Sequence, residues 1–327
     1  MLSRRKLLGS IAATTLAAPS FSTASFGQAN FPSQTITLIC PFATGSGADV
    51  WARYYANKLK EVSGATTIVE NKVGAGGLIA SQYVARAKPD GYTLYVIPGA
   101  NVLGSAPHVF KQLPFDPVND FEHVTTMAKT VLLLLVSANS PYKTVDDLVA
   151  DLKKKGDKGS YASVSNTSLA VSELFKAAFD LQTVEVKFPA FAPAINEMNS
   201  GNISFVFLDG AQSLGHLTEG RMRALAQTTA ERTSGLPNIP GAREAGIKNM
   251  DIALWWSVHL PKGTPQAIVS KYEEWFDKIT ASADVQKFLA DSGTSPFPGN
   301  SKQLKALLEE EIKNWGTYAR LAKIVPQ

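Results

Sequence analysis

Cysteine and histidine are both scarce in this chain of 327 residues. Cys40 is the single cysteine, so no disulfide can form within the chain. It ends the apolar run 36–40, where we expect a buried, unreactive thiol. The four histidines, His108, His123, His216 and His259, show no metal-ligand spacing such as His-Glu-x-x-His. The sequence therefore predicts no metal site, and we expect structural or surface roles for the histidines.

Signatures of catalysis and of cofactor binding are missing as well. The stretch Gly45-Ser46-Gly47 does not form the Gly-x-Ser-x-Gly turn of hydrolases. Val50 stands where a dinucleotide-binding loop would have its third glycine, and no P-loop lysine follows. No motif supplies a nucleophile together with a base and an orienting group. We therefore predict a protein that is not an enzyme and that needs no cofactor.

Beyond residue 29 the chain has neither a long apolar run nor an excess of one charge. The apolar run 131–136 is far shorter than the roughly 18 residues of a membrane span, and it predicts a buried strand. The formal net charge is +4, and it falls by three to +1 if Arg4, Arg5 and Lys6 leave with an export signal. Such a nearly neutral surface gives no support for nucleic acid or an anionic membrane as a partner.

The first 29 residues have the layout of an export signal. A basic stretch at 4–6 precedes the apolar stretch 7–18, and small residues lead to a suitable cleavage site near Ala29. The pair Arg4-Arg5 fits a twin-arginine signal, and the same layout fits the Sec route, so both routes stay open. We therefore predict a periplasmic protein whose mature chain starts near Asn30.

Strand-like and helix-like segments alternate along the mature chain, which predicts an α/β protein. No linker separates two domains, so we expect two interleaved lobes. Lobe 1 would comprise residues 30–130 and 252–327, and lobe 2 residues 131–251. The two chain crossings, near Thr130 and Ile252, would form a hinge, and the cleft between the lobes is the expected ligand site.

Two polar loops join a predicted strand to a predicted helix. Their residues are Phe42, Ala43, Thr44, Gly45, Ser46 and Gly47 in the first loop, and Ser163, Val164, Ser165, Asn166 and Thr167 in the second. Free backbone N–H groups at a helix start favour an anion, and the hydroxyls add donors. A plain turn with Asp49 in the first helical turn explains the first loop equally well, and a helix cap explains the second. If the loops face each other, they would hold a carboxylate without an arginine.

Several motifs occur in a characteristic order along the mature chain. They are Pro41-Phe42, Val69-Glu70-Asn71-Lys72, Gly74-Ala75-Gly76-Gly77, Lys88-Pro89-Asp90-Gly91-Tyr92-Thr93-Leu94, Leu113-Pro114-Phe115-Asp116-Pro117, Gly220-Arg221-Met222-Arg223-Ala224-Leu225-Ala226 and Pro261-Lys262-Gly263-Thr264-Pro265. With these motifs in this order, the chain resembles the periplasmic solute receptors of tripartite tricarboxylate transporters, the TctC or Bordetella uptake gene (Bug) family.

The resemblance implies a two-lobed periplasmic binding fold, type II-like, with a hinge of two crossing strands and no catalysis. It also implies a small organic carboxylate as ligand and delivery of that ligand to the membrane permease subunits of the transporter. A second partner stays open, because the same lobes can present a ligand to a sensor kinase.

By the same resemblance, ligand contacts come from segments 42–47, 98–102 and 163–167. The chain departs from the family pattern at several of these positions. Pro98 and Asn101 lie where Gly-Thr-Ser-Gly-Thr is usual, and Asp209 stands where an asparagine is frequent. Phe188, with Phe191 and Trp255 or Trp256, would wall an aromatic slot, although core packing is the more common fate of such residues. We therefore expect an aromatic or dicarboxylic acid rather than citrate.

Overall fold

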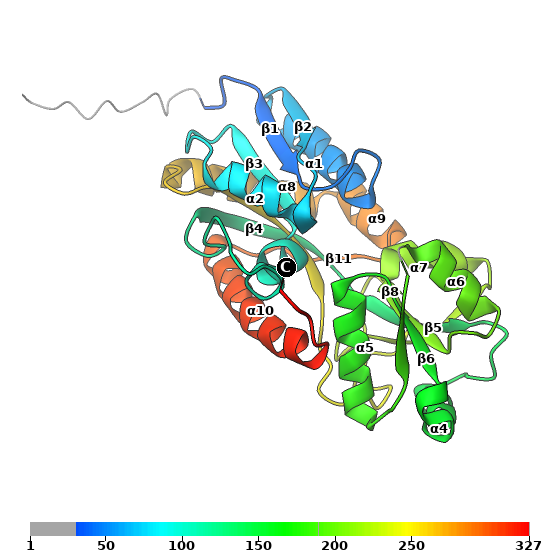
Figure 1. Cartoon of the computed structure of the whole chain (residues 1–327). Helices are drawn as coiled ribbons and strands as arrows, with labels where there is room; N and C mark the ends of the chain where they lie inside the picture. Colours follow the sequence, from blue (N-terminus) through cyan, green and yellow to red (C-terminus); the bar gives the residue numbers. More distant parts are fainter. Residues whose placement is uncertain (1–30, 189, 327) are drawn as a thin grey trace, which may run out of the picture. The chain divides into compact units, whose positions relative to one another are not determined.

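The computed structural model describes residues 31–188 and 190–326. The predicted export signal and its cleavage site lie outside this part of the chain. The described residues form a mixed α/β structure with a six-stranded and a five-stranded sheet (Figure 1). Among the described residues, the helices are all too short or too polar to traverse a lipid bilayer.

The first sheet is built from two separate parts of the chain. Its spatial order is β11 (Ser295–Pro296), β4 (Phe121–Thr130), β10 (Leu254–Pro261), β3 (Thr93–Pro98), β1 (Ile36–Cys40) and β2 (Thr67–Asn71). The strands β2, β1 and β3 are parallel, whereas β10 runs antiparallel to both β3 and β4. Because β10 returns from the second sheet to lie between β3 and β4, the chain crosses between the sheets twice.

The second sheet comes from one continuous part of the chain. Its order is β7 (Val184–Lys187), β6 (Ser160–Ser163), β8 (Phe205–Asp209), β5 (Leu132–Ser137) and β9 (Met222–Gln227). The strands β7, β6 and β8 are parallel, and β5 is antiparallel to β8 and β9. Only Val131 separates β4 from β5, so one crossing between the sheets is almost a continuous strand. The lobe boundaries given by the sequence remain a prediction.

Strand β5 shows why an uninterrupted apolar run forms a central strand. Successive side chains of a strand point to opposite faces, so both faces must be covered if all the residues are apolar. Leu132 and Leu134 pack on one face against α4 (Val145–Lys155) and α5 (Asn166–Phe179). Leu133 and Leu135 pack on the other face against α6 (Phe191–Asn199). Residues 132–136 are all buried, as the sequence predicts.

Helices cover the first sheet as well. They are α1 (Gly47–Ser63), the 3-10 turn η2 (Ala75–Gly77), α2 (Leu78–Ala85), the π-helical turn η3 (Ala100–Gly104), α3 (Ala106–Val109), α8 (Gln266–Ala281), α9 (Ala283–Asp291) and α10 (Ser301–Leu321). Leu304 and Leu308 of α10 share a core with Tyr95 and Ile97 of β3. Since Trp315 lies further along the same helix, the packing of α10 on this sheet fixes where Trp315 lies.

The remaining elements lie near the second sheet. They are the 3-10 turn η4 (Gly156–Lys158) and α7 (Gly210–Thr218). The alternation of strands and helices that the sequence predicts is present. The apolar run 131–136, predicted as a buried strand, forms β5 with boundaries shifted by one residue. The strand β4 and the helices α7 and α9 were not predicted.

Candidate functional site

A cavity of about 500 Å³ lies where the edges of the two sheets meet. From the first sheet and its helices it is lined by Phe42, Ala75, Gly76, Asn101, Val102, Ser105, Val109, Phe110, Leu254 and Trp315. From the second sheet and its helices it is lined by Leu132, Ser165, Asn166, Thr167, Ser168, Phe191, Phe207, Leu208, Asp209 and Gln212. A volume of this size suits a small organic molecule.

The start of α5 presents unpaired backbone donors to this cavity. Ser165 is the N-cap, and its hydroxyl accepts a hydrogen bond from the Ser168 N–H at 3.1 Å. The Ser168 hydroxyl accepts in turn from the N–H groups of Val164 and Ser165, which completes a capping box. The N–H groups of Asn166 and Thr167 have no partner inside the helix. The positive end of the α5 dipole and these two donors therefore face the cavity.

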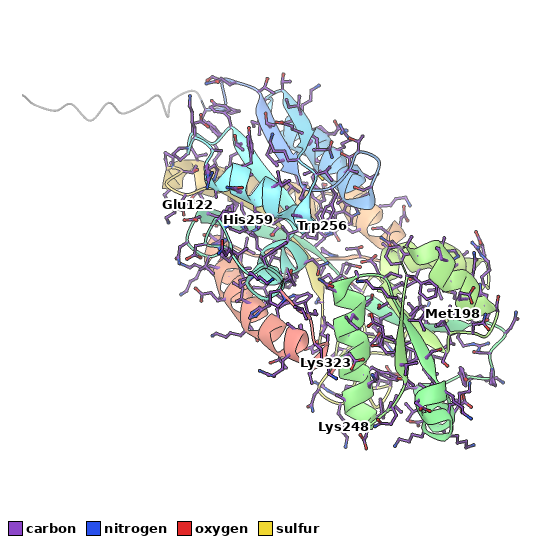
Figure 2. The ribbon with its side chains drawn as sticks, viewed as in Figure 1. Glu122, Met198, Lys248, Trp256, His259 and Lys323 are labelled. Atoms are coloured by element: carbon purple, nitrogen blue, oxygen red, sulfur yellow. The ribbon has the colours of Figure 1, made fainter. Side chains whose placement is uncertain are left out.

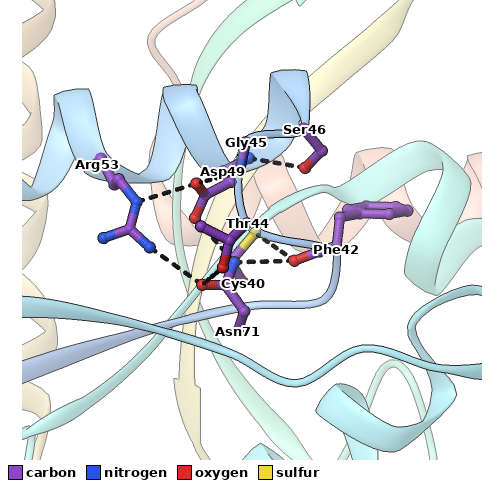
Figure 3. Close-up of polar contacts among 8 residues, drawn as sticks. All are labelled: Cys40, Phe42, Thr44, Gly45, Ser46, Asp49, Arg53 and Asn71. Carbon is purple, nitrogen blue, oxygen red and sulfur yellow. Dashed lines mark hydrogen bonds and ion pairs between the residues drawn. The ribbon is translucent and has the colours of Figure 1, made fainter.

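The loop before α1 is held by a carboxylate of the chain itself (Figure 3). Asp49 is buried, and its Oδ2 accepts from the Gly45 N–H and from Arg53 Nε, both at 2.9 Å. Its Oδ1 accepts from Asn71 Nδ2 at 2.8 Å. The Arg53 guanidinium is the largest of the causes that hold the pKa of Asp49 at about 2, so the carboxyl is ionised at neutral pH. An internal anion thus takes the Gly45 N–H of the first loop, while the Ser46 hydroxyl caps α1 by accepting from the Asp49 N–H.

The start of α7 is also occupied by a carboxylate. Asp209 ends β8, and its Oδ1 accepts from the N–H groups of Ala211 at 2.9 Å and of Gln212 at 3.4 Å. Its Oδ2 has a single partner among the described residues, the Thr130 hydroxyl at 3.4 Å. Asp209 forms no ion pair with any described residue, and burial raises the pKa of its carboxyl. The cavity lining therefore contains a carboxyl group without a cationic partner.

A hydrogen bond between two lining residues joins the two sides of the cavity. The Thr167 hydroxyl, on α5, donates to Asn101 Oδ1, on η3, at 3.2 Å. Directly after η3, the Ser105 hydroxyl donates to the Asn101 carbonyl at 2.5 Å. On its far side η3 packs tightly on α10, since a Cβ at Gly104 would lie 2.6 Å from Glu311 Cγ. Burial raises the pKa of Glu311 to about 7. The segment that carries Asn101 is thus held between α10 and α5.

Aromatic and aliphatic side chains form most of the remaining wall. Phe110, Phe191, Phe207 and Trp315 all line the cavity. Of the aromatic residues suggested by the sequence, Phe191 therefore lies at the site. Trp255 is buried in the core of the first sheet. An apolar wall of this kind suits a ligand with a hydrocarbon or aromatic body.

Other aromatic residues named by the sequence lie elsewhere. Trp256, which Figure 2 labels, lies on β10 and stacks on Trp51 with ring centroids 4.8 Å apart. Phe188 packs beside the core cluster that contains Leu133 and does not line the cavity. These two side chains therefore contribute to packing, which is the alternative that the sequence left open.

The structure brings together six of the fifteen residues predicted for the site. Phe42, Asn101, Ser165, Asn166, Thr167 and Asp209 line the cavity, whereas Ala43, Thr44, Gly45, Ser46, Gly47, Pro98, Ser163, Val164 and Phe188 do not. Several of the latter support the site. Gly45 and Ser46 bind Asp49, and Val164 completes the cap of α5. The role of each residue in ligand binding remains a prediction.

Sequence reasoning missed several lining residues. Gln212 lies three residues after Asp209, so the start of α7 was the signal that could have revealed it. Phe110 and Trp315 gave no local signal, because only packing of distant segments brings them to the cavity. The described residues contain no group of three histidine, cysteine or acidic side chains that could hold a metal ion.

The two buried histidines, His123 and His259, are hydrogen-bonded to each other inside the first sheet, and each has one further partner. His123 Nε2 lies 2.9 Å from the Val118 carbonyl, so this nitrogen must carry a proton. His123 Nδ1 lies 2.9 Å from His259 Nδ1, and His259 Nε2 lies 2.7 Å from the Ser257 hydroxyl. Burial lowers the pKa of both histidines. Every nitrogen has a partner when both rings are neutral, so these residues have a structural role.

Comparisons with known proteins agree with this architecture. A sequence profile described as "Tripartite tricarboxylate transporter family receptor" matches residues 51–322. The chain belongs to this family, TctC. A UPF0065 protein of Bordetella bronchiseptica is 30% identical over 98% of this chain and 96% of its own length. The protein BugT of Bordetella pertussis is 25% identical over 89% of this chain and 90% of its own length.

Solved structures extend the comparison to the fold. The R. palustris protein Rpa4515, solved with adipate, is 29% identical with a TM-score of 0.78, over 91% of this chain and 100% of that one. MatC of Rhodopseudomonas palustris, with bound malate, is 28% identical with a TM-score of 0.72, over 88% of this chain and 99% of that one. This TctC chain is therefore a periplasmic solute-binding receptor with a two-lobed α/β fold, and its family consists of receptors rather than enzymes.

Proposed function

We propose that this receptor binds a small organic carboxylate in the cavity and delivers it to the membrane permease of a tripartite tricarboxylate-type transporter. The observation that carries the proposal is the start of α5, where the N–H groups of Asn166 and Thr167 face the cavity without helical partners. Two relatives, Rpa4515 and MatC, are described with adipate and malate, both small organic acids.

The binding mode uses neutral donors instead of a cation. Among the described residues, no lysine, arginine or histidine lines the cavity, so a carboxylate would be held by backbone N–H groups and by the Ser165 hydroxyl. Hydrogen bonds from neutral groups to an ionised acceptor stabilise it strongly when both are shielded from water. Because the carboxylate itself forms no salt bridge, its hold is released easily when the lobes separate, which suits delivery to a permease.

The α5 donors can be removed one at a time. Proline is tolerated at the first position of a helix, and Ser165 has the extended backbone (φ −160°, ψ 165°) that a residue before proline prefers. Asn166→Pro deletes one N–H from the cavity, and we expect it to weaken carboxylate binding about 10-fold, the effect of losing one hydrogen bond to a charged group. Calorimetric titration with adipate, malate and hexanoate measures this loss.

The matched control is Asn166→Ala, which removes the same side chain but keeps the N–H. It should bind within about 3-fold of the unchanged protein, because only the backbone donor is at issue. Equal affinities of the two variants would contradict the proposal. The proposal would also be contradicted if the unchanged receptor bound none of the three acids. Transport of the same acid in vesicles containing the permease tests delivery, and ligand-dependent binding to a sensor kinase instead would replace the permease as the partner.

A further inference from the structure

The three helix starts that follow strands near the cavity differ in what they place in its wall. At α1 the Ser46 hydroxyl is the cap, and neither Ser46 nor the first helical residues line the cavity. At α7 the N–H groups are met by Asp209, which lines the cavity. At α5 the cap is a neutral serine, and the next two residues line the cavity and have N–H groups without a partner inside the helix. Of these three starts, α5 therefore offers a place for a ligand carboxylate, and α7 offers a negative charge instead.

The position of Asp209 makes this charge part of the cavity. Among the described residues that line the cavity, Asp209 is the only one with an acidic or basic side chain, and no described cation pairs with it. Its Oδ1 is used by the helix cap, while Oδ2 has only a long contact of 3.4 Å with the Thr130 hydroxyl. A half-buried carboxyl in which one oxygen has only this long contact is stabilised by a positively charged donor.

The helices α5 and α7 place their starts on opposite faces of the same sheet. They follow the neighbouring parallel strands β6 and β8, whose carboxyl ends lie at one edge. Val171 of α5 packs on one face of the sheet, and Leu214 of α7 packs on the other. One end of a ligand at this edge therefore meets the anion-binding start of α5, and its other end meets the carboxylate of Asp209.

We propose that the receptor selects a zwitterionic ligand, with one carboxylate held at the start of α5, a positively charged nitrogen held by Asp209 and an apolar body between them. This inference rests on the proposed function, because it assigns the ends of the carboxylate ligand. The dicarboxylates described for the relatives would place their second carboxylate against Asp209, where like charges repel in a site shielded from water.

Three six-carbon acids of equal length test the charge at the second end. We expect 6-aminohexanoate to bind at least about 10-fold more tightly than adipate. Hexanoate, whose second end carries no charge, should have an affinity between those of the other two acids. Asp209→Asn keeps an oxygen for the cap, since asparagine is as good an N-cap as aspartate. In this variant 6-aminohexanoate should bind about 10-fold more weakly and adipate more tightly, so that the preference is lost or reversed.

The control is Asp146→Asn, which removes an equal charge from an exposed position in the first turn of α4. It should leave the order of affinities unchanged, and both variants should melt close to the unchanged protein. Adipate binding as tightly as 6-aminohexanoate, or an order that Asp209→Asn does not alter, would overturn the inference while the proposed function stands. Failure of all three acids to bind would overturn both.

Discussion

At the scale of single residues, Asp49 lies buried in a network of polar groups near the site. Both of its carboxylate oxygens accept hydrogen bonds, from Gly45, Arg53 and Asn71. An asparagine at this position would point its NH₂ group at donors in either orientation. We expect Asp49→Asn to lower the free energy of unfolding by about 1–3 kcal/mol at neutral pH, the usual result of leaving buried donors unpaired. Urea denaturation measures the difference.

The same carboxyl gives the stability a defined pH dependence. The hydrogen bond from Arg53 lowers the pKa of Asp49 from 3.8 to about 2, so the folded state favours the ionised form. The stabilisation is therefore complete above pH 3.8 and is lost as the pH falls toward about 2. The difference between the unchanged protein and Asp49→Asn should shrink over this window, and a constant difference would contradict the assignment.

Asp49 also shows where residue-level prediction stopped. The sequence allowed two interpretations of loop 42–47, an anion site or a turn closed by Asp49. Deciding between them requires the position of Asn71, which is distant in sequence and adjacent only because β1 and β2 pair in parallel. The aspartate at 209 was visible in the sequence, but its lack of a cationic partner depends on which side chains the fold brings near it.

At the scale of elements, the start of α5 combines a structural and a binding role. Removing the Ser165 hydroxyl breaks the bond to the Ser168 N–H, so Ser165→Ala should cost about 1 kcal/mol in stability. It should also weaken carboxylate binding, because the hydroxyl lines the cavity and the first turn becomes less ordered. Thermal unfolding and calorimetric titration measure the two effects.

A second capping box in the chain supplies a matched control. Thr144 caps α4 through the Asp147 N–H at 3.1 Å, and neither residue lines the cavity. Thr144→Ala should lose a similar stability and leave binding unchanged. If the two variants bind the ligand equally well, Ser165 acts on stability alone.

The sequence predicted elements best where the burial pattern is simple. The apolar run at 131–136 predicted β5, because a strand covered on both faces needs apolar residues throughout. The strand β4 was missed since Glu122, His123, Thr125 and Thr126 interrupt its pattern, although His123 finds its partner in His259 on β10. Such polar residues become compatible with a strand only after the neighbouring strand is known.

At the scale of the whole molecule, the bond between Thr167 and Asn101 is a direct link across the cavity. Two-lobed receptors alternate between open and closed forms, and a link made only when the lobes are together favours the closed form. Thr167→Val keeps the shape and the backbone N–H but removes the hydroxyl. We expect a loss of about 1 kcal/mol from the closed form, which is about 5-fold in ligand affinity.

Calorimetric titration measures the affinity, and X-ray scattering without ligand measures the shift toward the open form. The control is Thr218→Val, whose hydroxyl donates to the Leu214 carbonyl within α7 and does not line the cavity. Scattering curves and affinities that are the same for both variants would show that the link does not bias the lobes.

The position of Trp315 on the cavity wall has a practical consequence. An indole that touches the bound molecule changes its emission when water around it is replaced, so the receptor carries its own optical probe. The other four tryptophans contribute background emission, and a Trp315→Phe variant would measure that background separately. Occupancy can then be followed by the light that the unlabelled protein emits, and collections of candidate nutrients can be screened without attaching a dye.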